Sequence, residues 1–189
     1  INSNETVQID SSSQEERDNL YGKSKKEGRK LLINWAKNNG GTFTGMIIPN
    51  VFGPFGKPFY NSVIATFCHQ LTHGETPTIN VDGELDLIYI NELNHDIYNI
   101  LTQKTSGTIT IPSRHQSSVS GILEILNNFK VLYLTKGIFP DIDQPFELAL
   151  FNTFRCYVPL DHYPAPYIQN TDVRGTFMEI AKAKSSGQF

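Results

Sequence analysis

The stretch LYGKSKKEGRKLLINWAKNNGGTFTGMII, residues 20–48, decides the fold of this chain. Its first part carries apolar side chains at 31–33 and 35 among Lys, Arg and Glu, which predicts a long amphipathic helix. The run NNGG at 38–41 is typical of a helix end. The short β-rich run at 42–48 then indicates a buried strand. A helix that leads into a buried strand is the repeating step of an α/β fold.

Strands and helices continue to alternate on both sides of this stretch. A β-rich segment at 7–12 precedes the helix, and a loop rich in Pro and Gly, residues 49–56, follows the strand. Further along, the patterning predicts strands at 78–81, 85–90 and 108–111 and helices at 60–73, 91–101, 117–129 and 144–158. This alternation predicts a parallel sheet that helices cover on both faces.

The composition excludes several classes of protein. The chain has 189 residues, a net charge of −3 and 39% hydrophobic residues, which is ordinary for a globular protein and not for a disordered one. No apolar run approaches the roughly 18 residues that span a membrane, and Lys and Arg form no basic patch for nucleic acid. Cys68 and Cys156 alone predict no disulfide framework, which favours a reducing cytoplasm.

The strongest chemical signal is YGKSK at residues 21–25. Tyr21 and Lys25 stand four positions apart, so a helix presents both on one face. A nearby cation lowers the pKa of a phenol toward neutrality, where the phenol can act as an acid or a base. The serines at 11–13 end the preceding strand, where α/β sheets bind ligands. A hydroxyl there could hydrogen-bond a substrate oxygen beside the phenol.

Two other groups of residues have structural interpretations beside the functional ones. The five His residues show no metal-ligand spacing, and His69 with His73 fits a pair on a helix surface, so no metal site is predicted. The loop at 52–60 holds four aromatic residues, which either pack in a core or form the wall of a ligand cleft. The sequence leaves both possibilities open for this loop.

The order of these features resembles one enzyme family. A strand, a serine cluster, YGKSK, a long helix, a strand and the loop PNVFGP at 49–54 follow the pattern of the extended short-chain dehydrogenases/reductases. These are NAD(P)-dependent epimerases, dehydratases and reductases of sugar nucleotides, with a Rossmann-like sheet. The resemblance extends over about residues 7–101. Segments 61–69 and 172–179 further resemble a bacterial group of capsular polysaccharide reductases, in which a cupin domain follows the reductase domain.

The resemblance implies roles for the YGKSK motif. Tyr21 matches the tyrosine that protonates the substrate oxygen as hydride arrives from the nicotinamide. Lys25 matches the lysine that lowers the tyrosine pKa and binds the nicotinamide ribose. Ser12 is the favoured match to the catalytic serine or threonine, with Ser11 and Ser13 as alternatives. The resemblance therefore implies a catalytic trio of Tyr21, Lys25 and Ser12, with NADP or NAD as cofactor.

The resemblance also implies contacts outside that motif. Pro49 matches the loop that faces the nicotinamide, so it is an expected cofactor-binding residue. Asn50 matches a side chain that reaches the sugar nucleotide. Asn61 and Ser62 are expected to touch the phosphate or sugar of the same substrate.

The chain departs from the family pattern in two ways. Many relatives place a phosphate-binding arginine where this chain has Leu85, so Arg114 and Lys57 are the candidate cations for substrate phosphate. None of the 14 Gly residues forms the closely spaced fingerprint that holds the coenzyme pyrophosphate. We therefore expect the N-terminal half of the Rossmann-like domain, with its glycine-rich site, to lie before Ile1.

The resemblance divides the chain into three parts. Residues 1–142 are the C-terminal half of the reductase domain, an α/β unit with part of a parallel sheet and its covering helices, truncated at the N-terminus. Residues 143–168 are a helical segment and linker, and 169–189 are the truncated start of a cupin-like domain. A sheet without its first strands exposes an unpaired edge, which predicts a homo-oligomer.

Three functional hypotheses follow. The first is a fragment, inactive alone, of an NAD(P)-dependent reductase of a UDP-linked 4-keto-6-deoxy-amino sugar in capsular or surface polysaccharide biosynthesis. The second is a UDP-sugar epimerase or dehydratase that uses the same Tyr21, Lys25 and Ser12 with tightly bound NAD. The third is a non-catalytic half-domain that binds a sugar nucleotide or a partner. Neither nucleic acid nor a membrane is an expected partner.

Overall fold

The computed structural model describes residues 5–9, 20–103, 107–162, 169–178 and 182–183. The contacts of the chain divide it into two compact units. Unit 1 comprises Ile1–Val51 and Leu85–Gln116, and unit 2 comprises Phe52–Glu84 and Ser117–Phe189. Each unit therefore joins two segments that are distant in sequence.

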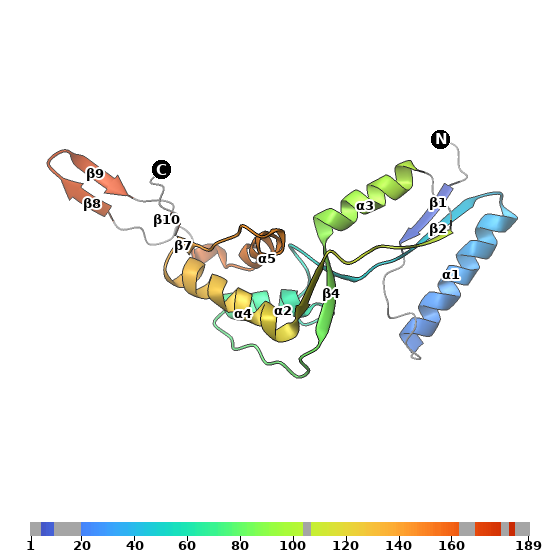
Figure 1. The fold of residues 1–189 in the computed structure, drawn as a ribbon, viewed down its shortest axis with the longest axis horizontal. Coiled ribbons are helices and arrows are strands. Elements are labelled where there is room, and N and C mark those ends of the chain that lie inside the picture. The colour runs from blue at the N-terminus through green and yellow to red at the C-terminus, as the bar shows by residue number, and fades with distance from the viewer. Residues whose placement is uncertain (1–4, 10–19, 104–106, 163–168, 179–181, 184–189) are drawn as a thin grey trace. The chain divides into compact units, whose positions relative to one another are not determined.

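Unit 1 is built on a parallel sheet of three strands in the order β1-β2-β5 (Figure 1). The strands are β1 (Glu5–Ile9), β2 (Thr42–Ile47) and β5 (Gly107–Thr110). β2 lies in the middle, with its Met46 opposite Ile9 and its Ile47 opposite Thr110. The sheet confirms the predicted α/β fold class, and because the strands are parallel, all three carboxyl ends lie at one edge.

Two helices, α1 (Leu20–Asn38) and α3 (Ile90–Thr102), cover the two faces of this sheet (Figure 1). Side chains alternate along β2, so Gly45 faces one side and Met46 the other. The Arg29 side chain of α1 comes within 3.7 Å of the position that a Cβ on Gly45 would occupy. Met46, in contrast, belongs to one buried cluster with Leu93 of α3. The predicted covering of both faces is confirmed.

The core of unit 1 is aliphatic. Five buried residues form it, none more than 5% exposed: Met46, Ile48, Ile88, Leu93 and Ile111. Ile97 and Ile100 of α3 pack against this cluster. They follow Leu93 at the i+4 and i+7 positions, which is the apolar stripe of an amphipathic helix.

A second sheet has the order β3-β4-β6. Its strands are β3 (Asn50–Phe52), β4 (Glu84–Tyr89) and β6 (His115–Ser118). Only β4 is among the strands that the sequence predicts. β3 lies in the loop rich in Pro and Gly, and β6 is polar and stands where the helix at 117–129 was expected to begin. Such short strands depend on a pairing partner more than on their own side-chain pattern.

The prediction of a strand at 78–81 is wrong, because the structure has no strand there. The residues that follow it bond to the start of a helix instead. The Asp82 carboxylate accepts a hydrogen bond from the Ser120 backbone N–H at 2.9 Å, and the Gly83 carbonyl accepts one from the Val119 N–H at 3.1 Å. The β-branched residues of the segment favour a strand only where a partner strand is available.

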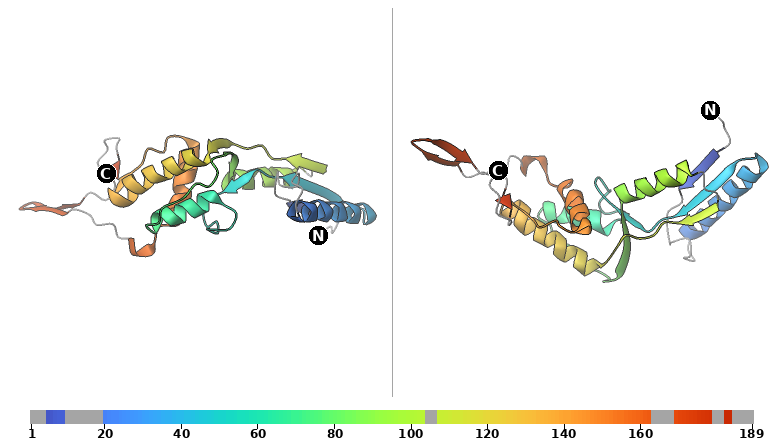
Figure 2. Two further views of the ribbon diagram at one scale, coloured as in Figure 1. Left: turned by 90° about the horizontal axis from the view of Figure 1, so that it is seen from below. Right: turned by 45° about the horizontal axis from the view of Figure 1, so that its top comes forward.

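Unit 2 is mainly helical (Figure 2). Its helices are α2 (Val63–Thr72), α4 (Val119–Phe129), the π-helical turn η2 (Lys130–Thr135), α5 (Pro145–Arg155) and the 3-10 turn η3 (Leu160–His162). The helices α2, α4 and α5 pack against one another. The predicted helices at 60–73, 117–129 and 144–158 are confirmed, although each begins slightly later than predicted.

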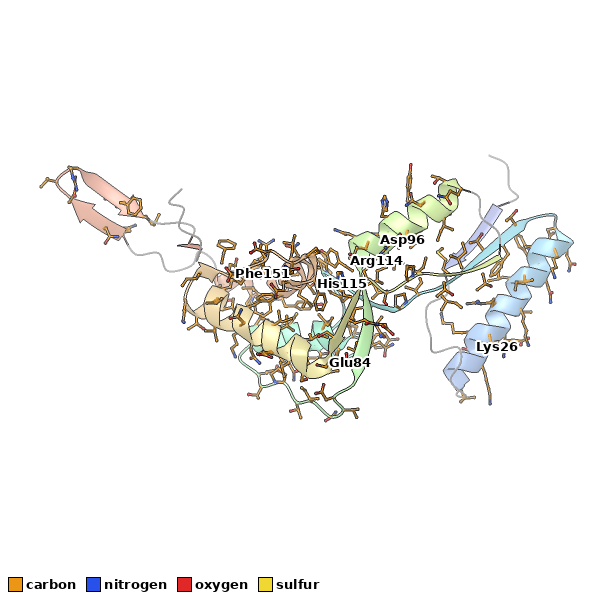
Figure 3. All side chains as sticks on the ribbon, in the orientation of Figure 1. Lys26, Glu84, Asp96, Arg114, His115 and Phe151 are labelled. Carbon is orange, nitrogen blue, oxygen red and sulfur yellow. The ribbon has the colours of Figure 1, made fainter. Side chains whose placement is uncertain are left out.

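Aromatic side chains fill the core of unit 2. Phe151 of α5 (Figure 3) makes edge-to-face contacts with three rings, at centroid distances of 5.2 Å to Phe129, 5.1 Å to Tyr133 and 6.2 Å to Phe139. Phe154 lies about one turn after Phe151 in α5, and its ring centroid is 5.9 Å from that of Phe129. Edge-to-face ring pairs add stabilisation beyond the area that they bury.

The C-terminal part of unit 2 is extended. β7 (Ile138–Phe139) pairs with β10 (Lys182–Ala183), and β8 (Gln169–Asp172) forms an antiparallel hairpin with β9 (Gly175–Met178). That the hairpin begins a cupin-like domain, and that the domain boundaries lie near 142 and 168, stay predictions. None of the helices in the described residues is both long and apolar enough to cross a membrane.

Candidate active site

The carboxyl edge of the parallel sheet in unit 1 gathers several predicted site residues. Ligands of α/β sheets bind at this edge. Pro49 and Asn50 follow the end of β2, and Arg114 lies in the segment after β5. α1 connects the end of β1 to the start of β2, so its first turns, with Tyr21 and Lys25, begin at the same edge.

Tyr21 and Lys25 lie one turn apart in α1. Because the predicted helix forms, the four-residue spacing places both positions on one of its faces. The Lys25 side chain is half-buried, whereas the Tyr21 side chain lies outside the described part of the structure. Ser12, and its alternatives Ser11 and Ser13, also lie outside the described residues. The catalytic roles of this trio stay predictions.

Asn50 is the first residue of β3 and is tied to the neighbouring strand. Its side-chain Nδ2 donates a hydrogen bond to the backbone carbonyl of Asp86 in β4, at 3.2 Å. The side chain is exposed, so this bond orients an amide at the surface next to Pro49.

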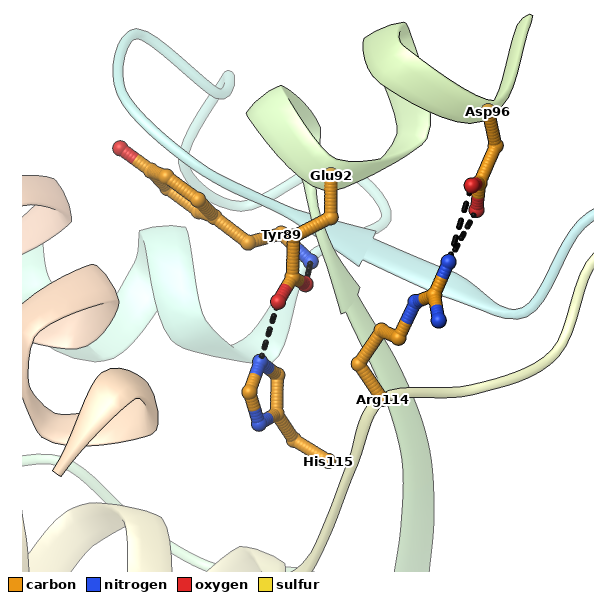
Figure 4. A network of polar contacts seen from close by, with 5 residues as sticks. All are labelled: Tyr89, Glu92, Asp96, Arg114 and His115. Atoms are coloured by element: carbon orange, nitrogen blue, oxygen red, sulfur yellow. Dashed lines mark hydrogen bonds and ion pairs between the residues drawn. The ribbon is translucent and has the colours of Figure 1, made fainter. Parts of the chain in front are cut away.

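Arg114 forms an ion pair with Asp96 of α3 (Figure 4). Its Nη2 lies 2.9 Å from each carboxylate oxygen, and the arginine side chain is 43% exposed against 17% for the aspartate. A pair with this exposure contributes about 0–1 kcal/mol to stability. The main consequence of the pair is that it orients the Arg114 side chain, because one nitrogen of the guanidinium is bonded to Asp96 of α3.

The next residue, His115, makes a similar contact one turn earlier on α3 (Figure 4). Its Nε2 lies 3.2 Å from Oε1 of Glu92, whose Oε2 accepts a hydrogen bond from the Tyr89 backbone N–H at 3.0 Å. Glu92 therefore caps the start of α3 and holds His115. Sequence patterning indicates the cap through an acidic first turn, but it misses His115, whose partner lies 23 residues away.

Asp86 completes the support of the segment 113–116. Its Oδ1 accepts a hydrogen bond from Gln116 Nε2 at 2.7 Å and lies 3.4 Å from the Ser113 hydroxyl. All four consecutive residues of this segment therefore contact a carboxylate of β4 or α3. These contacts orient the segment 113–116, and with it Arg114.

Asn61 and Ser62, the remaining predicted substrate residues, lie in unit 2 at the start of α2. Ser62 is the N-cap, and its Oγ accepts a hydrogen bond from the Ala65 backbone N–H at 3.2 Å. Both residues line a pocket of about 340 Å³. The other residues that line it are Phe59, Tyr60, Val63, Thr66, Phe67, Gln70 and Thr78. A helix start beside aromatic and amide side chains suits an anionic group attached to a ring.

The aromatic residues of the loop at 52–60 divide between the two predicted roles. Phe52 is 3% exposed and packs edge-on against Phe146, with ring centroids 5.8 Å apart, so it is a core residue. Phe55, Phe59 and Tyr60 are 86%, 61% and 71% exposed, and the last two line the pocket.

Lys57, the second candidate cation, lies beside this pocket. Its Nζ is 5.6 Å from the centroid of the Tyr60 ring, which is a cation–π distance. The two candidate cations therefore belong to different units, Lys57 to unit 2 and Arg114 to unit 1.

The described residues bear on two kinds of bound group, the expected cofactor and a metal ion. Lys25 and Pro49 stay the predicted cofactor-binding residues, and Pro49 follows β2 at the carboxyl edge of the sheet, where α/β sheets bind nucleotides. In the described part of the chain, no three His, Cys, Asp or Glu residues lie close enough together to hold a metal ion.

Cys68 is a core residue. It is completely buried in α2, and burial, reinforced by nearby Cys156, raises the pKa of its thiol well above the ordinary value. A thiol that stays protonated is no nucleophile.

One family profile and one curated relative match the sequence. The NAD dependent epimerase/dehydratase family matches residues 3–111. The UDP-2-acetamido-2,6-beta-L-arabino-hexul-4-ose reductase of Pseudomonas aeruginosa is 31% identical over 186 residues, which cover 95% of this chain and 49% of that protein.

Solved structures match the fold. The capsular polysaccharide assembling protein CapF from Staphylococcus aureus has a TM-score of 0.81 and 33% identity, over 97% of this chain and 52% of that one. The UDP-glucose 4-epimerase of Thermus thermophilus, in complex with NAD, has a TM-score of 0.63 at 14% identity, over 82% of this chain and 64% of that one, and shows a shared fold alone. The chain spans about half the length of the reductase and of CapF.

Proposed function

The chain belongs to the NAD dependent epimerase/dehydratase family, and from this we propose that it is the catalytic half of an NAD(P)-dependent reductase of a UDP-linked 4-keto-6-deoxy-amino sugar. The P. aeruginosa relative, named as a reductase of a UDP-linked hexul-4-ose, supports the reaction type. The S. aureus relative, named for capsular polysaccharide assembly, supports a role in making capsular or surface polysaccharide.

One observation carries the proposal furthest, the common edge of the sheet in unit 1. The first turns of α1, with Tyr21 and Lys25, begin at the edge where β2 ends at Ile47, shortly before Pro49 and Asn50. This is the edge where parallel α/β sheets bind their ligands. This topology supports the proposal that Tyr21, Lys25 and Asn50 act at one site.

The proposed chemistry needs a proton and a hydride. The Tyr21 phenol donates its proton to the C4 oxygen of the keto sugar, which becomes the alcohol. A bound nicotinamide coenzyme supplies the hydride that C4 receives. Lys25, one turn further along α1, favours the phenolate that remains. A hydroxyl of the serine cluster, with Ser12 favoured, hydrogen-bonds the same C4 oxygen.

Substrate binding is proposed for both units separately. In unit 2 the start of α2, with Asn61 and capping Ser62, suits the diphosphate, because helix N-termini favour anions. Phe59 and Tyr60 offer exposed rings beside it, and Lys57 adds a positive charge. In unit 1, Asn50 and Arg114 are the proposed contacts to the sugar and its phosphate.

An epimerase or dehydratase is the second candidate function, because the matching family includes both activities. It would use the same Tyr21, Lys25 and Ser12 and would return the coenzyme to its starting state after each turnover. A non-catalytic half-domain that binds the sugar nucleotide is the third candidate. The coenzyme distinguishes the first two, since a reductase consumes it in proportion to product.

The test uses the intact protein with NADPH or NADH and a UDP-linked 4-keto sugar, and it compares coenzyme oxidation with product formed. We expect one coenzyme oxidised for each product molecule. Tyr21→Phe should lower kcat about 10²- to 10⁴-fold, because the proton donor is lost while the ring remains. Product without net coenzyme oxidation would favour the epimerase, and unchanged turnover in Tyr21→Phe would remove both enzymatic functions.

We further propose that the protein is a homo-oligomer of the cytoplasm. α1 exposes Leu31 and Trp35, which are 62% and 45% exposed. Exposed apolar side chains promote association. Sedimentation at several protein concentrations tests the oligomer, and a monomer at all concentrations would contradict it.

A further inference from the structure

The loop 53–60 of unit 2 has an unusual backbone. Phe55 has a φ of 64° and Phe59 a φ of 57°, so two bulky residues lie in the left-handed region that favours glycine. Residues in this region persist only where their surroundings hold them, and they cluster at functional sites. Contacts near both ends of the loop hold it in this conformation.

A tyrosine two residues after the end of α5 provides the shortest of these contacts. The Tyr157 hydroxyl donates a hydrogen bond of 2.6 Å to the Gly56 carbonyl, across 101 residues of sequence. The approach is close, because a Cβ on Gly56 would lie 3.3 Å from the same hydroxyl oxygen. Tyr157 itself is tied to α2, since its backbone carbonyl lies 2.8 Å from the Thr72 hydroxyl.

The other end of the loop is tied to the pocket. The Phe59 backbone N–H donates to the Thr66 hydroxyl at 2.9 Å, and that hydroxyl donates to the Ser62 carbonyl at 2.9 Å. Phe59, Ser62 and Thr66 all line the pocket at the start of α2. A shift of the loop at Gly56 therefore moves one wall of the pocket.

We propose that Tyr157 is a positioning residue that holds the loop 53–60 in its strained conformation and thereby sets the affinity of the α2 pocket for a uridine diphosphate group. The ligand class rests on the proposed function; the role of Tyr157 rests on the contacts of unit 2 alone. Tyr157 does not line the pocket, so it acts through Gly56 and the loop. Burial raises the pKa of Tyr157 to about 12, so its hydroxyl remains a donor throughout the neutral range.

The experiment compares the wild-type protein with Tyr157→Phe in two measurements. Amide hydrogen exchange of the peptide that contains 53–60 reports the loop, and calorimetric titration with UDP reports the pocket. Because one neutral hydrogen bond is removed, the amide exchange rate of the loop should rise roughly fivefold. The dissociation constant of UDP should also rise roughly fivefold. The melting temperature shows that the variant is folded, and kcat should stay unchanged while KM rises.

The matched control is Tyr98→Phe, which removes a hydroxyl from a 65% exposed tyrosine of α3 and should change neither measurement. A second variant, Gly56→Ala, places a Cβ against the Tyr157 hydroxyl and should have a smaller effect when Tyr157 is already Phe. Equal loop exchange and equal UDP affinity in wild type and Tyr157→Phe would overturn the role of Tyr157. A wild-type protein that does not bind UDP would instead overturn the ligand and the proposed function, and the exchange data would still decide the positioning role.

Discussion

The two units of the chain bury different kinds of side chain and offer different kinds of site. Unit 1 closes an aliphatic core between a parallel sheet and α3, around Met46, Ile88 and Leu93. Unit 2 closes an aromatic core between helices, around Phe129 and Phe151. The sheet provides a regular edge where several residues are held in register, whereas the helical unit provides a pocket and a strained loop.

This difference suggests a division of work. Regular elements hold side chains in fixed positions, which acid–base chemistry requires. Loops with exposed rings adapt better to the shape of a ligand. We therefore expect variants at Tyr21 and Lys25 in unit 1 to lower turnover and variants at the α2 pocket in unit 2 to lower affinity.

The largest effect is expected from Phe151→Ala in the core of unit 2. The substitution removes a completely buried ring that contacts Phe129, Tyr133 and Phe139, and it should cost about 3–5 kcal/mol of unfolding free energy. Urea unfolding measures this loss. Leu148→Ala, on the same helix but 41% exposed, is the control and should cost much less. Equal losses would mean that the aromatic cluster is not the core of unit 2.

The next effect is expected from Lys25→Met in unit 1. Loss of the ammonium one turn from Tyr21 should lower kcat about 10²-fold, because the phenolate loses its neighbouring cation. The dissociation constant of UDP should not change, since Lys25 is proposed to act on Tyr21 and the coenzyme and not on the diphosphate. Steady-state kinetics and calorimetry measure the two quantities. Lys26→Met, at an exposed position next in sequence, is the control. A change in UDP affinity alone would contradict the division of work.

A smaller effect is expected from Ser62→Ala in unit 2. It removes the N-cap of α2, which should cost about 1 kcal/mol of stability, and it should weaken UDP binding while kcat stays the same. Ser118→Ala is the matched control, because Ser118 caps α4 through a 3.0 Å hydrogen bond from the Gly121 N–H. Both variants should lose similar stability, but only Ser62→Ala should bind UDP more weakly. Equal UDP affinities would remove Ser62 from the binding site.

The smallest effect concerns pH. Hydrogen bonds from Ser120, from its side chain first and its backbone second, hold the pKa of Asp82 below the ordinary value of about 3.9. A carboxyl with a lowered folded-state pKa stabilises the fold above the unfolded pKa, and this stabilisation disappears as the pH falls through the folded pKa.

Asp82→Asn should therefore lower the melting temperature slightly at pH 7, and the difference should shrink as the pH falls below the ordinary aspartate pKa. Thermal unfolding over a series of pH values measures it, with Asp143→Asn, another exposed carboxylate, as control. A difference that persists in acid would show that Asp82 acts other than through its charge.

The sequence predicts the repeating elements well and the short ones poorly. The long helix at 20–38 and the strand at 42–47 follow from patterns of many residues, so local preference and burial agree. β3 and β6 are three and four residues long, and the failed strand at 78–81 is equally short. In such segments the available partner outweighs local propensity.

The candidate site divides in the same way. Tyr21 and Lys25 can be found from sequence, because their four-residue spacing means adjacency on any helix. The contacts of Arg114 with Asp96 and of His115 with Glu92 cannot be found, since 18 and 23 residues separate the partners. The hydrogen bond of Tyr157 to Gly56 spans a still longer separation, and no local pattern indicates it.

The sequence by itself therefore determined the fold class, the helix that carries Tyr21 and Lys25, and the resemblance to NAD(P)-dependent enzymes of sugar nucleotides. These depend on periodicity and on motifs that a few turns of chain contain. Only the tertiary structure decided which carboxylates hold the segment 113–116, which aromatic residues of the loop at 52–60 are buried, and that Tyr157 holds this loop. The reason is physical: such contacts depend on distances between segments far apart in the chain, and these distances exist only after both cores have packed.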